Sequence, residues 1–217
     1  MMTSLDGRID CSMTSHLPGV QEYYNTLDSL DAPSRVSGRV TAQFEMAQPG
    51  TFSSEVKTPL GEEAFSKKVN ADGYEIVTDT HGTLLWDAAE SEHPLLILTC
   101  ESVSSDYLRY LDDLNISWIA CGKNHIDLPR ACEILAEEFG VKRMAAVGGG
   151  HINAAFLAAG LLDEVSILIG AGIDGREGMA AVFDGLPNER PVTALRLQSV
   201  RQFESGAVWL RYGVGKQ

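Results

Sequence analysis

Short runs of consecutive apolar residues alternate with amphipathic segments through the middle of the chain. Runs of this length and composition are typical of strands buried on both faces of a sheet. They are LLILT (95–99), ISWIA (116–120), VKRMAAV (141–147) and EVSILIG (164–170). The alternation therefore predicts strands joined by crossover helices.

Two of the intervening segments carry start and stop signals of helices. In SSDYLRYLDDLN, Ser104 is a candidate N-cap, and leucines at every third position share one face. In IDLPRACEILAEEFG, Asp127 is the expected N-cap and Gly140 the stop. Buried strands connected in this way favour a parallel sheet covered on both faces.

Two hairpins are predicted outside this middle region. GYEIVTD and TLLWD flank residues 80–82, and VTALRLQSVRQF and AVWLRYGV flank residues 204–206. Antiparallel hairpins make the predicted sheet mixed. The sequence has no internal repeat, low-complexity tract or linker, so it predicts a single domain over residues 1–217.

Composition and charge narrow the classes of partner. The chain has 217 residues and 44% hydrophobic residues, enough for a substantial core. Its 30 acidic and 17 basic residues give a net charge of −13, which disfavours nucleic acid. No window approaches the roughly 18 apolar residues of a membrane span, and no basic segment leads into an apolar run at the N-terminus. We therefore expect a cytoplasmic protein without a membrane partner.

Most other distinctive residues favour structural roles. The four cysteines form no C-x-x-C pair and are expected to be apolar fillers in a reducing compartment. The five histidines lack metal-ligand spacing such as H-x-x-x-H, so no metal is expected. Trp86 and Trp118 are expected in the core rather than in a stacking platform.

Three consecutive glycines, Gly148–Gly150, lie between a predicted strand and a helical segment rich in alanine and leucine. A helix start carries unpaired N–H groups and partial positive charge, and glycines let an anion approach them. A bound phosphate and a tight turn without a ligand are equally compatible with this stretch. The run is not the G-x-G-x-x-G fingerprint, so a standard Rossmann domain does not fit.

Two other segments are candidates for the same ligand. Thr99, like the glycines, follows a predicted strand, and ligands of open α/β sheets bind beyond such carboxyl ends. In SGRVTAQFEMA (37–47), a helix is predicted to begin near Arg39. One helix terminus stabilises an anion by about 0.3–1 kcal/mol, whereas micromolar binding requires about 8 kcal/mol. Several contacts must therefore converge, as a dinucleotide with its phosphates allows.

Five motifs occur along the chain in an order that is typical of one enzyme family. They are MTSLDGRID at the N-terminus, SGRVT (37–41), LLILT (95–99), VGGGHINAAFLAAGLLDEV (147–165) and GAGIDGREG (170–178). In these motifs the chain resembles the reductase domain of the riboflavin-biosynthesis pyrimidine reductases, whose fold is that of dihydrofolate reductase. The resemblance implies a three-layer α/β fold with a mixed, mainly parallel sheet flanked by helices, a C-terminal antiparallel hairpin, and NADPH across the strand ends.

The resemblance also implies which residues bind NADPH. The pyrophosphate-binding turn of the family matches Gly148, Gly149, Gly150, His151 and Ile152. The helix start that contacts the cofactor's phosphates matches Gly38, Arg39 and Thr41. The residue that ends the strand beside the adenosine ribose matches Thr99.

The N-terminal SLDG matches the family's strand-to-loop turn beside the nicotinamide. Hydride transfer to a C=N bond requires a proton for the nitrogen, so an acid or an ordered water must lie nearby. Asp6 is the candidate catalytic acid, although Asp6–Gly7 is equally a plain turn signal. Ser4 is a candidate for orienting the substrate or the carboxamide.

The implied function is an NADPH-dependent reductase of riboflavin biosynthesis that acts on a ribosylamino-pyrimidine as its small-molecule substrate, and the resemblance implies a homodimer. Val147 departs from the glutamate that often precedes the three glycines in the family. An apolar side chain cannot make that carboxylate's hydrogen bonds, so a reductase of the same fold with a different substrate is one alternative. A nucleotide-binding module without turnover is another. A dihydrofolate reductase proper is disfavoured, because SLDG stands where that enzyme has a different loop.

Overall fold

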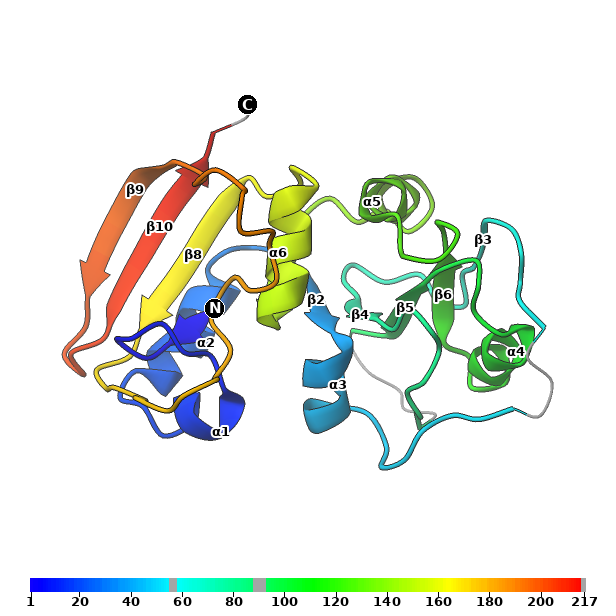
Figure 1. Ribbon diagram of the computed structural model, residues 1–217, viewed down its shortest axis with the longest axis horizontal. Coiled ribbons are helices and arrows are strands. Elements are labelled where there is room, and N and C mark those ends of the chain that lie inside the picture. The colour runs from blue at the N-terminus through cyan, green and yellow to red at the C-terminus, as the bar shows by residue number, and fades with distance from the viewer. Residues whose placement is uncertain (55–57, 88–92, 216–217) are drawn as a thin grey trace. The chain divides into compact units, whose positions relative to one another are not determined.

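The computed structural model describes residues 1–54, 58–87 and 93–215. The chain forms two compact units, and the elements of both are labelled in Figure 1. The first unit comprises Met1–Asp31 and Gly148–Gln217, and the second comprises Ala32–Val147. The prediction of one domain over residues 1–217 stays a prediction.

A four-stranded sheet forms the scaffold of the first unit. Its strands, in spatial order, are β1 (Met2–Thr3), β8 (Glu164–Ile169), β10 (Val208–Val214) and β9 (Leu195–Gln202). β1 and β8 are parallel, while β8, β10 and β9 are antiparallel. The predicted C-terminal hairpin is confirmed, because β9 and β10 pair along their length and Phe203 N–H donates to the Ala207 carbonyl at the turn (3.0 Å).

Three helices belong to the first unit. They are α1 (Cys11–Thr14), α2 (Val20–Asp28) and α6 (Gly150–Ala158). Around α2, a small core forms in which Met2, Leu168 and Ala207 are buried. Gly19 precedes α2 with φ +108°, and a Cβ on it would lie 2.7 Å from the Ala207 Cβ. A glycine is therefore required where this helix meets the sheet.

The second unit is built on a six-stranded sheet. Its spatial order is β3 (Ala64–Ser66), β6 (Ser117–Ala120), β5 (Leu95–Thr99), β4 (Glu75–Thr78), β2 (Ser34–Gly38) and β7 (Met144–Gly148). β6, β5, β4 and β2 are parallel, and β3 is antiparallel to β6. The strand predicted over 141–147 begins later, at Met144, because Lys142 and Arg143 are exposed to solvent.

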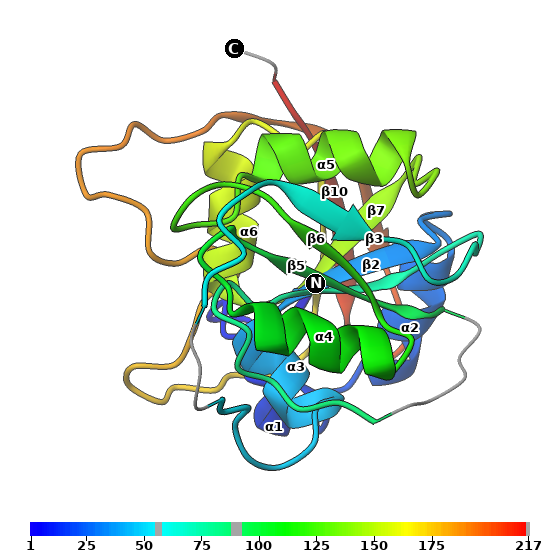
Figure 2. The same cartoon turned by 90° about the vertical axis from the view of Figure 1, so that its right-hand side faces the viewer.

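Helices lie on both faces of this second sheet. They are α3 (Arg39–Glu45), α4 (Ser105–Asp113) and α5 (Leu128–Glu137), and Figure 2 shows α5 on one side of the strands with α3 and α4 on the other. The predicted N-caps are confirmed. The Ser104 side chain accepts from Asp106 N–H, and that of Asp127 accepts from Arg130 N–H. Both tryptophans expected in the core are buried there.

The hairpin predicted from residues 73–79 and 83–87 is wrong. β4 pairs in parallel with β2 on one edge and with β5 on the other, so no edge is left for a returning strand. Instead, the buried Asp79 carboxylate accepts from the N–H groups of Thr83 (2.6 Å) and Leu84 (2.8 Å). The side chain thus closes a turn that leads the chain away from the sheet.

The predicted fold class, a mixed α/β structure with sheet strands flanked by helices, is confirmed. The hydrogen-bonded strands form two sheets, one in each unit, whereas the sequence predicts a single sheet. The cysteines only partly follow expectation, since Cys100 and Cys121 are buried but Cys11 is exposed. In the part of the chain that the structure describes, no helix is long and apolar enough to cross a membrane.

Candidate functional site

The three glycines form the junction between β7 and α6. Gly149 is the N-cap of α6 and has φ +89° and ψ 124°, a backbone conformation that residues with a side chain rarely adopt. As a glycine it has no side chain with which to cap the helix. The first N–H groups of α6 are therefore available to an anion, and the macrodipole favours a negative charge there.

Gly150 is required by packing within the first unit. A Cβ on this residue would lie 2.4 Å from the Ala181 carbonyl oxygen. Asp184 N–H donates to the Gly150 carbonyl (3.1 Å), and the Asp184 carboxylate accepts from Ala181 N–H (2.7 Å). The close approach at Gly150 is thus between two backbone segments of the protein. For this glycine the tight turn explains the residue type without a ligand.

Sequence reasoning missed Asn153, which lies in the first turn of α6. Its side-chain amide donates to the Val182 carbonyl (2.8 Å) and so holds the segment that packs on Gly150. Its Oδ1 is buried and has no hydrogen-bond partner among the described residues. The available signal was a lone amide side chain in the otherwise apolar stretch INAAFLAAG. A buried acceptor without a partner destabilises the fold by about 1–3 kcal/mol. We therefore expect a polar group to pair with this oxygen.

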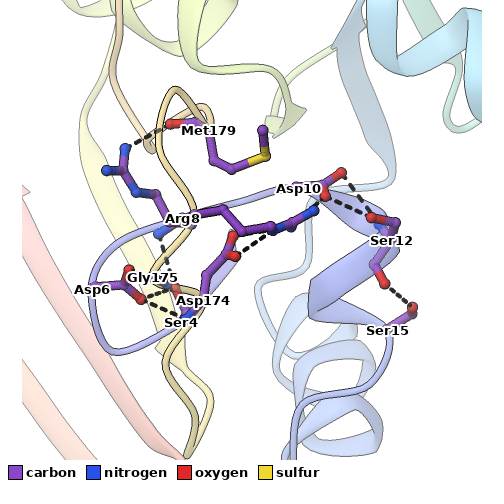
Figure 3. A network of polar contacts seen from close by, with 10 residues as sticks. Ser4, Asp6, Arg8, Asp10, Ser12, Ser15, Asp174, Gly175 and Met179 are labelled. Atoms are coloured by element: carbon purple, nitrogen blue, oxygen red, sulfur yellow. Dashed lines mark hydrogen bonds and ion pairs between the residues drawn. The ribbon is translucent and has the colours of Figure 1, made fainter.

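Ser4 and Asp6 lie together in the turn that follows β1, as Figure 3 shows. The Ser4 hydroxyl donates to Asp6 Oδ1 (2.7 Å), and the N–H groups of Asp174 and Gly175 donate to the same carboxylate (3.0 Å each). Hydrogen bonds hold the pKa of Asp6 well below its usual range. The bond from the Ser4 hydroxyl has the largest effect, and the bonds from the two backbone N–H groups come next. Asp6 is therefore ionised at neutral pH and acts as an acceptor.

The hydrogen bonds of Asp6 and Ser4 affect the catalytic and substrate-orienting roles that the sequence predicts for these side chains. A general acid works best with a pKa near the working pH, and the pKa of Asp6 is shifted in the opposite direction. The Ser4 hydroxyl is also occupied, because it accepts from Arg8 N–H (3.0 Å) while donating to Asp6. Both side chains hold the shape of their turn and of the loop that faces it.

The loop after β8 is fastened to the loop after β1 by further contacts. Leu5 N–H donates to the Gly172 carbonyl (2.7 Å). Arg176 bridges two carboxylates, with its Nη2 2.7 Å from Asp10 Oδ2 and 3.0 Å from Asp174 Oδ2. Because β1 and β8 are parallel neighbours, these loops lie at the carboxyl ends of adjacent strands. Such ends are where α/β sheets bind ligands.

In the second unit, α3 also begins without a side-chain cap. Gly38 is its N-cap, Arg39 is its exposed first residue, and Thr41 lies half-buried two residues further on, in the same turn. Ser37, which sequence reasoning did not assign to the site, is the last residue but one of β2, and its Oγ is buried. That Oγ has no hydrogen-bond partner in the described ranges. The start of α3 is thus uncapped, like that of α6. It is flanked in sequence by the unpaired Ser37 Oγ and the cationic Arg39.

The sequence and the fold of this chain are similar to those of known proteins. Residues 1–209 match the family described as the RibD C-terminal domain. The chain belongs to this family. A pyrimidine reductase-like protein from Corynebacterium diphtheriae has a similar structure, with a TM-score of 0.74 and 18% sequence identity, over 100% of this chain and 90% of that one.

Two longer proteins contain a similar fold. RibD from Acinetobacter baumannii aligns with a TM-score of 0.68 and 16% identity, over 99% of this chain and 56% of that chain. The diaminohydroxyphosphoribosylaminopyrimidine deaminase/5-amino-6-(5-phosphoribosylamino)uracil reductase from Thermotoga maritima aligns with a TM-score of 0.59 and 12% identity, over 99% and 55%. This RibD C-terminal domain therefore spans little more than half the length of these two proteins.

Within this RibD C-terminal domain, Thr99 differs from the other predicted contacts. It stands at the same carboxyl edge of the second sheet as Gly38, with β4 between their strands. Its side chain is fully buried, and its hydroxyl donates to the Thr80 carbonyl (3.0 Å). The hydroxyl of Thr99 thus shapes the end of β5, and the predicted contact of this residue with the cofactor stays a prediction.

Proposed function

We propose that this RibD C-terminal domain is an NADPH-dependent reductase that transfers a hydride to the C=N bond of a ribosylamino-pyrimidine. Family membership over residues 1–209 supports an oxidoreductase role. The reductase named for the Thermotoga maritima protein of similar fold supports this substrate class. The observation that carries the proposal is the uncapped start of α6 behind Gly149, whose φ of +89° a side chain would disturb.

Each unit, taken by itself, offers donors to an anionic group. In the first unit, the N–H groups at the start of α6 offer donors to a pyrophosphate. In the second unit, the start of α3 and the exposed Arg39 offer donors to a phosphate, and the buried Ser37 hydroxyl lacks a partner within the described ranges. An extra ribose phosphate requires such a local cation, because the chain as a whole carries a charge of −13.

NADPH, when bound, supplies the hydride, and the protein holds and orients the reactants. Asp6 and Ser4 act as positioning residues, because their hydrogen bonds fix the loops that follow β1 and β8. The ionised Asp6 has no proton to donate at neutral pH. We infer that an ordered water delivers the proton to the substrate nitrogen.

The test is the loss of NADPH absorbance at 340 nm with 5-amino-6-(5-phosphoribosylamino)uracil, the substrate in the name of the Thermotoga maritima protein. Substrate-dependent oxidation of NADPH supports the reductase. NADPH binding without turnover of this compound rejects the substrate assignment.

A nucleotide-binding module without turnover is the second candidate, and the three hydrogen bonds that occupy the Asp6 carboxylate are the observation that favours it. A screen of other heterocyclic C=N compounds separates the two. Turnover of any of them identifies a reductase of different specificity, consistent with Val147 in place of the family's usual glutamate. Tight NADPH binding with no turnover in the whole screen favours the module.

A further inference from the structure

A cavity of about 290 Å³ lies in the first unit beside α6 and β8. Leu157 in the last turns of α6 and Val165 near the start of β8 contribute to its walls. The glycine turn, in contrast, precedes α6, and the loop held by Asp6 follows β8. Among the lining residues, Phe183 adjoins the glycine turn, because Asn153 donates to the Val182 carbonyl and Asp184 N–H donates to the Gly150 carbonyl. Leu157 and Val165 lie at the other end of α6 and at the start of β8.

Most of the lining is apolar. Beside Leu157 and Val165, the walls include Phe183 and Leu186, which belong to the segment that runs alongside α6 and leads into β9 (Figure 2, orange), and Leu195, the first residue of β9. A cavity of this size is close to the lower end of ligand sites, roughly 300–1,000 Å³. It fits a small ligand with an aromatic or alkyl body.

Arg190 supplies a positive charge to this lining. Its Nη1 is buried and has no hydrogen-bond partner among the described residues. Its Nη2 donates to the Leu157 carbonyl over a long 3.4 Å, and that carbonyl also accepts from Gly160 N–H (3.2 Å). No carboxylate within residues 1–54, 58–87 and 93–215 pairs with the guanidinium.

The unpaired Nη1 donor favours an anionic partner. Guanidinium groups bind carboxylates through two parallel N–H donors. The chain's overall charge of −13 repels large polyanions. The fitting occupant is thus small, with one negative charge and an apolar body.

We propose that this cavity binds a small amphipathic carboxylate, whose apolar body packs against Leu157, Phe183 and Leu186 and whose carboxylate pairs with Arg190. This inference does not depend on the reductase function. Binding should require both the apolar body and the negative charge of the ligand.

The probe is decanoate, compared with decanol, in displacement of the fluorescent anion 8-anilinonaphthalene-1-sulfonate from the folded protein. We expect saturable binding of one probe per chain, displacement by decanoate, and at least tenfold weaker displacement by decanol. Arg190→Met keeps an apolar stem without the charge and should weaken decanoate binding at least tenfold. Arg109→Met, at an exposed arginine on α4 of the second unit, is the matched control and should leave decanoate binding unchanged.

A second variant tests the site even if Arg190→Met does not fold. Leu186→Glu places a carboxylate in the lining, where it should pair with Arg190 and abolish decanoate binding. The proposal is overturned if no saturable binding occurs, if both arginine variants bind alike, or if NADPH displaces the probe. It is also overturned if Arg190→Met dissociates a dimer, because a second copy of the chain would then occupy the cavity.

Discussion

The carboxylate of Asp6 accepts a hydrogen bond from the backbone N–H of Gly175, 169 positions further along the chain. Together with the bond from Asp174 N–H, it ties the loop after β8 to the turn after β1. Ser4 completes the arrangement from within the same turn. One ionised side chain thus sets the geometry of two loops at the carboxyl ends of parallel strands.

We expect Asp6→Asn to destabilise the protein at neutral pH, because an amide cannot accept from all three donors. The pKa of Asp6 is lowered in the folded state, so its contribution is present above the unfolded pKa of about 3.9 and is lost as the pH falls below that value. Urea unfolding at pH 7 and between pH 5 and 2 measures the difference. The gap between wild type and variant should close on acidification.

Asp72→Asn is the matched control, since Asp72 is an exposed aspartate in the second unit. It should leave the free energy of unfolding nearly unchanged at each pH. A gap for Asp6→Asn that stays constant down to pH 2 would contradict the ionised state of Asp6.

The pH dependence of turnover tests the source of the proton. If water delivers it, Asp6→Asn should lower kcat/KM by less than about tenfold and leave the shape of its pH profile unchanged. Removing a true general acid lowers the rate by about 10²–10⁴-fold and removes a limb of the profile. NADPH oxidation followed from pH 5 to 9 distinguishes these results. Loss of a limb would restore Asp6 as the catalytic acid.

Local signals were sufficient to predict several elements. Ser104 and Asp127 cap α4 and α5 as their positions indicated, because capping depends on residues two or three positions away. The C-terminal hairpin was predictable for the same reason, since its turn and both strands are adjacent in sequence.

Other features depend on contacts that no local pattern reveals. The alternation of residues after Asp79 predicts a returning strand, but β2 and β5 already occupy both edges of β4. The ionised state of Asp6 depends on Asp174 and Gly175, which are remote in sequence. Thr99 was correctly placed at a strand end, yet its hydroxyl is used by the Thr80 carbonyl.

Cofactor choice provides a test of Arg39. If this exposed residue pairs with the 2′-phosphate, Arg39→Ala should weaken NADPH binding by roughly 10–100-fold, since a hydrogen bond to a charged group contributes about 1.5–3 kcal/mol. NADH binding should change little. Calorimetric dissociation constants for both nucleotides measure the effect. Arg109→Ala, an exposed arginine on α4, serves as the control, and an Arg39→Ala variant that keeps its preference for NADPH would refute the assignment.

We also propose that the chain forms a homodimer through β9. This strand is the edge of its sheet, all eight of its residues are exposed, and they include Leu195, Leu197 and Val200. Exposed apolar edge strands tend to pair with another chain. Light scattering at micromolar concentration should give twice the 23.5 kDa mass of the chain. Val200→Lys should shift it toward the monomer, whereas Tyr24→Lys on α2 should not, and a monomeric wild type would reject the proposal.

The two ends of α6 allow the glycine turn to be tested with a matched pair. Gly149 precedes the helix with φ +89°, and Gly160 follows it with φ +69°. Placing alanine at either position forces a side chain into backbone with positive φ, which is unfavourable for residues other than glycine. Both variants should therefore lose stability in urea unfolding. Only Gly149→Ala should also weaken NADPH binding, by tenfold or more, because only that Cβ stands at the helix start where the N–H groups are unpaired. Calorimetry at a temperature where both variants are folded measures this. Equal affinity in the two variants would show that the three glycines form only a turn.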